Sequence, residues 1–296
     1  MPPILLSATI GDKFDSLFYN LDMWIYSLFA GLHSPVMNKI AMAFTSFGDE
    51  YFIIAATLIA CVLCLFKKTR KYGIAIGAAV AIGTIITNFI AKPLVLRIRP
   101  YNTLQHNADY WSCYISAGAF SESDYSFPSG HTTGVFEIAV ALGICLRSKG
   151  KKGVSWIPSI FAILTACSRI YLCVHYPTDV IGGVIAGTLA GVIGYLVALL
   201  GCKIMESTFL DKIDLGTKIK ICPKTAVIIV TVFLLAAFGF TFGKQFGEGG
   251  NSQRCAYENN EYECYNEALV EDDSYPAIDG KSYCKIHWKE LSGQAE

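Results

Sequence analysis

The sequence predicts an all-α fold, a polytopic bundle of membrane-spanning helices. Apolar residues make up 53% of the 296-residue chain and charged residues only 16%, far from the balance of a soluble protein. Several apolar runs approach or reach the roughly 17–25 residues with which a helix crosses a bilayer. Basic residues gather in short loops between these runs, as they do in the cytoplasmic loops of membrane proteins.

Six apolar runs are the clearest predicted spans, and a seventh is weaker. The six lie at 51–66, 72–91, 131–146, 154–172, 180–202 and 225–243. The seventh, 23–47, is interrupted by His33, Pro35, Asn38 and Lys39. The segment before it mixes aspartates with apolar residues, so an interfacial helix that leads into a short span is the alternative. We expect no removable signal peptide, because no basic n-region followed by a short apolar core is visible.

These runs divide the chain into five expected parts. They are an interfacial segment at 1–22, a membrane core at 23–204, a cytoplasmic basic linker at 205–224, an additional transmembrane helix at 225–243 and an extracytoplasmic acidic tail with cysteines at 244–296. Within the spans, small residues recur at helical spacing at Gly73 and Gly77 and at Gly183, Gly187 and Gly191. Such faces allow close helix packing.

Basic residues set the expected orientation. They cluster at 67–71, 147–152 and 203–224, and the positive-inside rule places these loops in the cytoplasm. The segments 92–128 and 173–179 and the tail after residue 243 then face the extracytoplasmic side. Because the basic clusters are short and adjoin predicted spans, the expected partner is the lipid bilayer and no nucleic acid.

The stretch SFPSGHTTG at 126–134 introduces one of the spans. In a purely structural interpretation, Pro128 opens a helix, Ser129 caps it and His131 has no further role. In a functional interpretation, the backbone N–H groups beside Gly130 bind an anion and His131 lies next to it as a proton donor. The stretch alone leaves both open.

Polar residues at the outer ends of the spans favour the functional interpretation. Four are cations: Lys92, Arg97, Arg99 and Arg169. Charges at membrane depth are costly and indicate function, although each can also reach headgroups by snorkelling. His175 and Asp179 lie close behind Arg169. Asp179 can cap the next span and hold one imidazole nitrogen of His175, which leaves the other nitrogen free to attack.

This combination suits the transfer of a phosphate group. Cations and backbone donors stabilise the negative charge that is redistributed during the transfer, and two histidines can divide the roles of nucleophile and acid. No Asp, Glu, His or Cys residues with metal-ligand spacing join them in the sequence, so we expect chemistry without a metal ion or other cofactor.

Three motifs give the chain a family resemblance. The segments KPLVLRIRP at 92–100, PSGH at 128–131 and SRIYLCVHYPTD at 168–179 resemble, in order and spacing, the signature motifs of the type 2 phosphatidic acid phosphatase superfamily. The resemblance covers about residues 35–202. It implies a six-helix membrane phosphatase core that acts on lipid phosphates without a metal cofactor.

The resemblance also implies a role for each matched residue. His175 would attack phosphorus to form a phosphohistidine, Asp179 would orient it, and His131 would protonate the leaving oxygen and then help to activate water. The matched phosphate ligands are Lys92, Arg99, Ser129, Gly130 and Arg169. Arg97 is assigned no more than contact with headgroups. Because the two histidines must start in opposite protonation states, we expect a bell-shaped pH dependence.

The motifs specify the phosphate but leave its lipid open. The compact core and short loops resemble bacterial members that dephosphorylate undecaprenyl diphosphate on the outer face, which is the expected substrate. Phosphatidic acid, phosphatidylglycerol phosphate and diacylglycerol diphosphate are alternatives. A transporter or flippase would be expected to carry polar residues across the whole bilayer, and an inactive relative would lack a motif residue, whereas none is missing. The oligomeric state is not predicted.

Two outer segments carry further expectations. The loop 101–127 contains the aromatic residues Tyr101, Tyr110, Trp111, Tyr114, Phe120 and Tyr125, which we expect to anchor it at the headgroups or to cover a bound lipid. The tail carries Cys255, Cys264 and Cys284, and would share its compartment with Cys113. We expect at least one disulfide among these four. The alternatives are an acidic extension with free thiols and a zinc site that includes His287.

Overall fold

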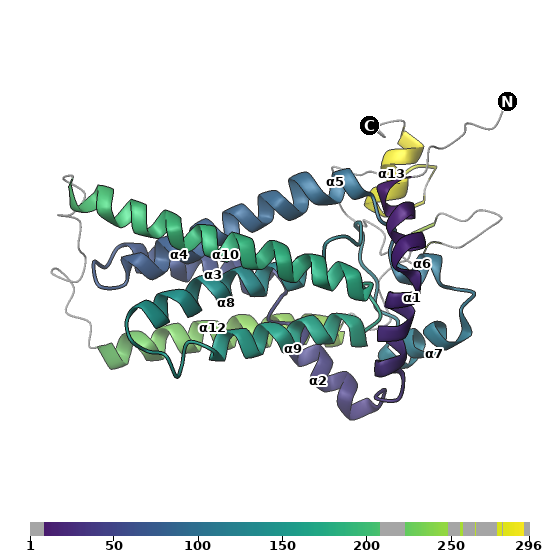
Figure 1. Ribbon diagram of the computed structural model, residues 1–296. Helices are drawn as coiled ribbons and strands as arrows, with labels where there is room; N and C mark the ends of the chain where they lie inside the picture. Colours follow the sequence, from purple (N-terminus) through teal and green to yellow (C-terminus); the bar gives the residue numbers. More distant parts are fainter. Residues whose placement is uncertain are drawn as a thin grey trace.

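The computed structural model describes residues 9–207, 223–247, 255–256, 264, 277–279 and 281–292. In chain order the helices are α1 (Ile10–Ala30), α2 (Pro35–Thr45), α3 (Glu50–Cys64), α4 (Arg70–Thr84), the π-helix η1 (Ile85–Ala91), α5 (Lys92–Val95), α6 (Pro100–Thr103), α7 (Ala108–Ala117), α8 (Gly130–Ser148), α9 (Ile157–Tyr171), α10 (Pro177–Glu206), α12 (Pro223–Gly247) and α13 (Lys285–Ser292). Most long helices run side by side, and α1 crosses one end of them (Figure 1). The chain is an all-α integral membrane bundle, as the sequence predicts.

Each of the six clear predicted spans corresponds to a helix of this bundle: α3, α4 continued by η1, α8, α9, α10 and α12. By length and composition, the stretches Pro35–Cys64, Arg70–Thr103 and Pro177–Glu206 can cross a membrane. Ile157–Tyr171 and Ile229–Gly243 are shorter apolar helices. The loops from α3 to α4 and from α8 to α9 leave the end of the bundle opposite to α1 (Figure 1). Most of the predicted basic linker, residues 208–222, lies outside the described residues.

The N-terminal region consists of a long helix, α1, and a separate short helix, α2. Thr9 begins α1 with a capping box, in which its hydroxyl accepts from the Asp12 N–H and the Asp12 carboxylate accepts from the Thr9 N–H. Helix α1 passes through residue 22 without a break, so the expected segment 1–22 ends inside a helix. Ser34 caps the separate helix α2, which packs against α9.

Helix α10 is the centre of the bundle and packs against α4 and α8. Close approach requires glycine on its face, because a Cβ on Gly187 would lie 2.6 Å from the backbone oxygen of Thr133 in α8. Gly183 and Gly191 approach α8 in the same way, and Gly73 approaches α3. Gly77 differs from the prediction, since a Cβ there would meet nothing within 4 Å. Its place in the repeat follows from helical spacing alone.

Tyrosines build a core at the end of the bundle that α1 crosses. Tyr101, Tyr110 and Tyr114 are 0%, 3% and 0% exposed, which corrects the expectation that they anchor the outer loop at the headgroups. Their hydroxyls have partners inside the protein; Tyr110, for example, donates to the Cys173 carbonyl at 2.6 Å. Tyr101 and Tyr114 donate to the carbonyls of Glu122 and Phe120, so the three tyrosines tie the outer loop and the turn between α9 and α10 to the protein.

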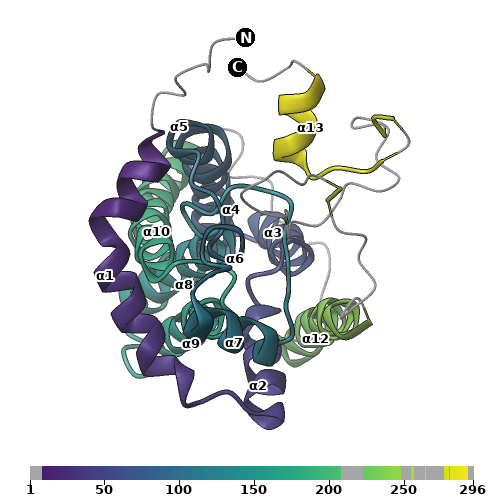
Figure 2. The ribbon, with the colours of Figure 1, turned by 90° about the vertical axis from the view of Figure 1, so that its right-hand side faces the viewer.

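The C-terminal region adds a helix at the edge of the bundle and a small unit beyond it. Helix α12 packs against α3, and α13 lies at the end that α1 crosses (Figures 1 and 2). None of the described cysteines forms a disulfide, which corrects the disulfide prediction. The Sγ atoms of Cys264 and Cys284 are 4.0 Å apart, whereas a disulfide requires about 2.05 Å. The acidic residues expected between 258 and 273 lie outside the described residues, and within that stretch the structure describes Cys264 alone.

Candidate active site

The turn between α9 and α10 presents His175 at the end of the bundle. The Tyr26 hydroxyl of α1 donates to the His175 carbonyl at 2.7 Å, and the turn contains a left-handed residue, Cys173, with φ of 56°. His175 itself is 1% exposed. A hydrogen bond from α1, which is distant in sequence, therefore holds the backbone of this histidine in place.

Asp179 holds the Nδ1 side of this imidazole. Its Oδ2 lies 3.7 Å from His175 Nδ1 and accepts from the backbone N–H of Tyr176 at 3.0 Å, so it caps α10 as the sequence predicts. Ser126 donates its hydroxyl to the same Oδ2 and lies 3.4 Å from Nδ1. Ser126 was not predicted from the sequence to take part, although it lies only two residues before the PSGH motif.

Arg99 approaches the other ring nitrogen. Its Nη1 lies 3.1 Å from His175 Nε2 and 3.0 Å from the Val174 carbonyl oxygen. A guanidinium can only donate, so Nε2 must carry a lone pair and the ring proton belongs on Nδ1. Burial first, and then the charge of Arg99, lower the pKa of His175 to about 4. The imidazole is therefore neutral at physiological pH.

Arg97 overturns the expectation that it contacts only headgroups. It is 0% exposed, and its Nη1 donates to Asp179 Oδ1 at 2.6 Å. Its other nitrogens bind Asp15 at 2.8 Å and Asp22 at 2.9 Å, both on α1. The guanidinium also stacks on the Tyr176 ring at 3.8 Å. Asp15 and Asp22 are distant from Arg97 in the sequence and reach it only through the position of α1.

The other three cations converge on two loop carboxylates. Lys92 and Arg99 pair with Asp124, while Arg99 and Arg169 pair with Glu122. Burial opposes ionisation of both acids, but the neighbouring cations outweigh it. The pKa of Asp124 falls to about 2 and that of Glu122 lies well below its usual range. Both acids are thus anions. They occupy the site that the side chains of Lys92, Arg99 and Arg169 form, which is called the cation site below.

Glu122 and Asp124 were not predicted from the sequence. The sequence feature that could have revealed them is the presence of two acids in the loop just before PSGH, on the side where the predicted cations gather. Arg169 also has a donor that is not paired within the described part of the chain. Its buried Nε has no hydrogen-bond partner among the described residues, and its Nη1 donates to Thr45 at 2.8 Å.

The PSGH motif forms the opposite wall. Ser129 is the N-cap of α8, and its hydroxyl accepts from Thr132 rather than facing the cations. A Cβ on Gly130 would come within 3.8 Å of Lys92 Nζ, so glycine leaves this approach open. His131 packs against Gly48. A Cβ on Gly48 would lie 2.8 Å from the Cβ of His131. Of the three residues, Ser129 supports the helix start while Gly130 and His131 face the cation site.

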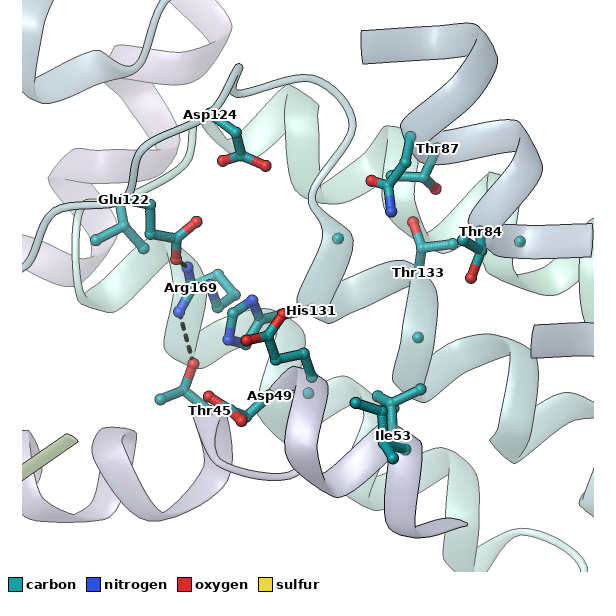
Figure 3. A pocket seen from close by; sticks show the side chains of 18 of the residues that line it. Thr45, Asp49, Ile53, Thr84, Thr87, Glu122, Asp124, His131, Thr133 and Arg169 are labelled. Atoms are coloured by element: carbon teal, nitrogen blue, oxygen red, sulfur yellow. Dashed lines mark hydrogen bonds and ion pairs between the residues drawn. The ribbon is translucent and has the colours of Figure 1, made fainter. Parts of the chain in front are cut away.

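A cavity of about 830 Å³ opens beside these groups. Figure 3 shows Glu122, Arg169 and His131 around one part of it and Thr84, Thr87 and Thr133 around another. His175 and Arg99 do not line it; they lie behind Glu122 and Asp124. The structure therefore assembles the predicted residues, but loop carboxylates separate the nucleophile from the cavity.

The inner part of the cavity contains a carboxyl group that the sequence analysis overlooked. Glu137, in the middle of α8, is 2% exposed and lines the cavity. Its Oε2 has no hydrogen-bond partner among the described residues. An ionisable residue inside a span is a functional candidate by default, and its position within the predicted span 131–146 would have revealed it.

Several known proteins with similar sequences are named as phosphatases. The lipid A 4'-phosphatase of Bacteroides thetaiotaomicron is 32% identical over 229 residues, which cover 74% of this chain and 93% of that protein. The undecaprenyl-diphosphatase BcrC of Bacillus subtilis is 31% identical over 56% of this chain and 80% of its own. Phosphatidylglycerophosphatase B of the same organism is 28% identical over 53% and 73%.

A solved structure has a similar fold. The crystal structure of a transmembrane PAP2 type phosphatidylglycerolphosphate phosphatase from Bacillus subtilis matches 66% of this chain and 92% of its own, with a TM-score of 0.50 and 23% identity. The family model of the PAP2 superfamily matches residues 71–200, which contain all three motifs. The chain thus belongs to the PAP2 superfamily and is a membrane phosphatase of the lipid phosphatase type.

Proposed function

We propose that the protein removes a terminal phosphate from a lipid phosphate or diphosphate through a phosphohistidine on His175. The observation that carries this proposal is the contact of Arg99 with His175 Nε2. It directs the nitrogen lone pair toward the cluster of Lys92, Arg99 and Arg169, which is where a phosphate would bind. Nucleophile and charge stabilisation then meet at one point.

In the first step, Nε2 attacks phosphorus and the bond between phosphorus and the lipid oxygen breaks. Three cations hold the phosphoryl oxygens once Glu122 and Asp124 have moved aside. His131, on the opposite wall, gives a proton to the departing oxygen. Asp179 faces the Nδ1–H and stabilises the positive charge that develops on the ring.

In the second step, water attacks the phosphohistidine. His131, now neutral, takes a proton from that water, and the bond between phosphorus and Nε2 breaks. Inorganic phosphate leaves, His175 is neutral again, and His131 is again protonated. The cycle uses protein groups alone.

The undecaprenyl diphosphate expected from the sequence remains the first candidate substrate. The cavity supports a lipid, because it continues from the cations between α3 and α4, where Ile53, Ile54 and Leu58 line it. The basic loops at the other end of the bundle support an active site on the extracytoplasmic side. Release of phosphate from a membrane-impermeant aryl phosphate by intact spheroplasts would test this side.

A 4'-phosphorylated lipid A is the second candidate. The relative with this activity matches over 93% of its own length. The cavity also carries hydroxyl and carboxyl groups at Thr84, Thr87, Thr133 and Glu137, which suit a sugar headgroup better than a prenyl chain. Comparing kcat/KM for the two substrates, with phosphatidylglycerol phosphate and phosphatidic acid alongside, would separate the candidates.

The mechanism is tested by trapping the intermediate. Purified protein in detergent, quenched rapidly after mixing with ³²P-labelled substrate, should carry acid-labile label, and His175→Ala should lose both label and turnover. His106→Ala is the matched control, since His106 is exposed on the same outer loop and should leave both unchanged. Near-native hydrolysis by His175→Ala would refute the assignment, and binding of lipid without phosphate release would favour a transporter.

A further inference from the structure

We infer that the C-terminal tail holds a structural Zn²⁺ ion, bound by Cys255, Cys264, Cys284 and His287. The candidate ligand atoms of these four residues all lie within 4.8 Å of one another. The residues are 6%, 3%, 0% and 3% exposed. Three thiols and an imidazole are a common ligand set for tetrahedral zinc.

The distances between the ligand atoms match a tetrahedral metal centre. Bonds of about 2.3 Å to sulfur and about 2.0–2.1 Å to nitrogen, at tetrahedral angles, separate two sulfurs by about 3.8 Å and a sulfur from a nitrogen by about 3.6 Å. Cys264 Sγ and Cys284 Sγ are 4.0 Å apart. His287 Nδ1 lies 3.4 Å from the sulfurs of both Cys255 and Cys284. The centre of the cluster therefore has room for one ion.

The backbone around the cluster brings the ligands together in the manner of a small zinc module. Cys284 directly precedes α13 and His287 lies in its first turn, so the Cys-x₂-His pair faces one side of the helix start. The Ala256 N–H donates to the Ser282 carbonyl at 2.9 Å, which places Cys255 beside this pair. Ile278 and Lys281 form an antiparallel bridge that turns the chain just before it.

Burial of the thiols also favours a metal. The buried cluster in the described part of the tail consists of the three cysteines, with Tyr283 packed against it. So small a unit cannot be stabilised by apolar burial alone and needs a cross-link. One disulfide would pair two of the cysteines and leave the third thiol and His287 buried at its side, whereas a metal ion uses all four.

Four protein ligands leave no open coordination position. The site is therefore structural rather than catalytic, and it is distinct from the His175 site. Metal binding would fix the segments around 255, 264 and 284 relative to one another, because binding and folding of such a module are coupled.

Zinc content tests the proposal directly. Full-length protein purified in detergent without chelators should contain about one zinc per chain by inductively coupled plasma mass spectrometry. Cys264→Ser and His287→Ala should each lose most of it, whereas Cys113→Ser, a cysteine of the outer loop, should retain it. Hydrolysis of an aryl phosphate by all variants verifies that the membrane core is folded. Wild-type protein without stoichiometric zinc would overturn the inference.

Alkylation of the wild type, followed by peptide mass spectrometry, needs no variant. With zinc bound, the three tail cysteines should resist a maleimide until a strong chelator is added, with no reductant present. Modification only after reduction would indicate a disulfide instead, and modification without chelator or reductant would indicate free thiols. Either result would exclude the zinc site.

Discussion

Arg97 and Arg99 stand two residues apart in one motif, yet they serve opposite sides of His175. Arg97 lies on the Asp179 side, where it is fully buried and binds Asp15, Asp22 and Asp179. Arg99 lies on the Nε2 side with Lys92 and Arg169, and its acidic partners come from an outer loop. Arg97 is 0% exposed and Arg99 is 1% exposed, so exposure alone does not distinguish them.

Charge balance distinguishes the two clusters. Around Arg97, three carboxylates face a single cation, which leaves no attraction for a further anion. On the other side, the ion pairs among the described residues join the three cations Lys92, Arg99 and Arg169 to two carboxylates, Glu122 and Asp124, so one positive charge remains in excess. A buried pair network of the first kind orients a residue, whereas an excess of cations binds an anion. The first cluster therefore supports the nucleophile and the second is suited to hold the phosphate.

The largest effect should follow from breaking the first cluster. Arg97→Ala leaves three carboxylates in a buried site without their cation, and removal of one partner from such a network costs about 3–5 kcal/mol. We expect a large drop in the thermal unfolding temperature in detergent. Arg147→Ala, which removes an exposed arginine at the opposite end of the bundle, should change it little. Equal changes in unfolding temperature for the two variants would contradict a structural role for Arg97.

Breaking the second cluster should affect catalysis instead of stability. Arg99→Ala and Arg169→Ala remove donors to the transferred phosphoryl group. Each should lower kcat/KM by an amount that corresponds to a loss of about 2–4 kcal/mol of transition-state stabilisation. Their unfolding temperatures should stay closer to wild type, because Lys92 and the remaining arginine still neutralise the loop acids. An Arg99→Ala variant that lost stability as Arg97→Ala does, with catalysis preserved, would reverse the comparison.

The sequence predicted the second cluster better than the first. Lys92, Arg99 and Arg169 stand in motifs whose spacing can be recognised directly, and the helices follow from apolar runs. The partners of Arg97 could not be found this way, because Asp15 and Asp22 lie more than 70 residues away and meet it only when α1 crosses the end of the bundle. Tertiary contacts of this kind leave no local periodicity.

The outer loop and the tail show the same limit. Tyr101, Tyr110 and Tyr114 have the composition of a headgroup anchor, and only the fold reveals that they pack around the 172–176 turn. For the tail cysteines the sequence predicted a disulfide and left free thiols and zinc as alternatives, since spacing alone does not give the distances between sulfurs. Glu137 was different, because a carboxyl group inside a predicted span could have been recognised from the sequence.

The acid side of the pH profile should report the environment that Arg99 provides. Burial and Arg99 lower the pKa of His175 to about 4, so the neutral, nucleophilic form persists as pH falls until that range is reached. The acid limb of kcat/KM should therefore lie well below the usual histidine value of about 6.5. Arg99→Ala should move it toward neutral pH. Since both enzymes use the same substrate, its own ionisation cancels in the comparison, and an unmoved limb would assign it to another group.

The smallest expected effect concerns the loop acid that occupies the cation site. Glu122 bridges Arg99 and Arg169 and must leave them before a phosphate binds, so it competes with the substrate. Glu122→Gln removes the competing charge and should lower the inhibition constant of vanadate about five- to tenfold, equivalent to about 1 kcal/mol. Asp109→Asn, at an acid of the same outer region, should leave the constant unchanged. A higher constant for Glu122→Gln would mean that Glu122 organises the arginines for phosphate, and the cluster would then resemble that of Arg97, in which acids hold an arginine in place.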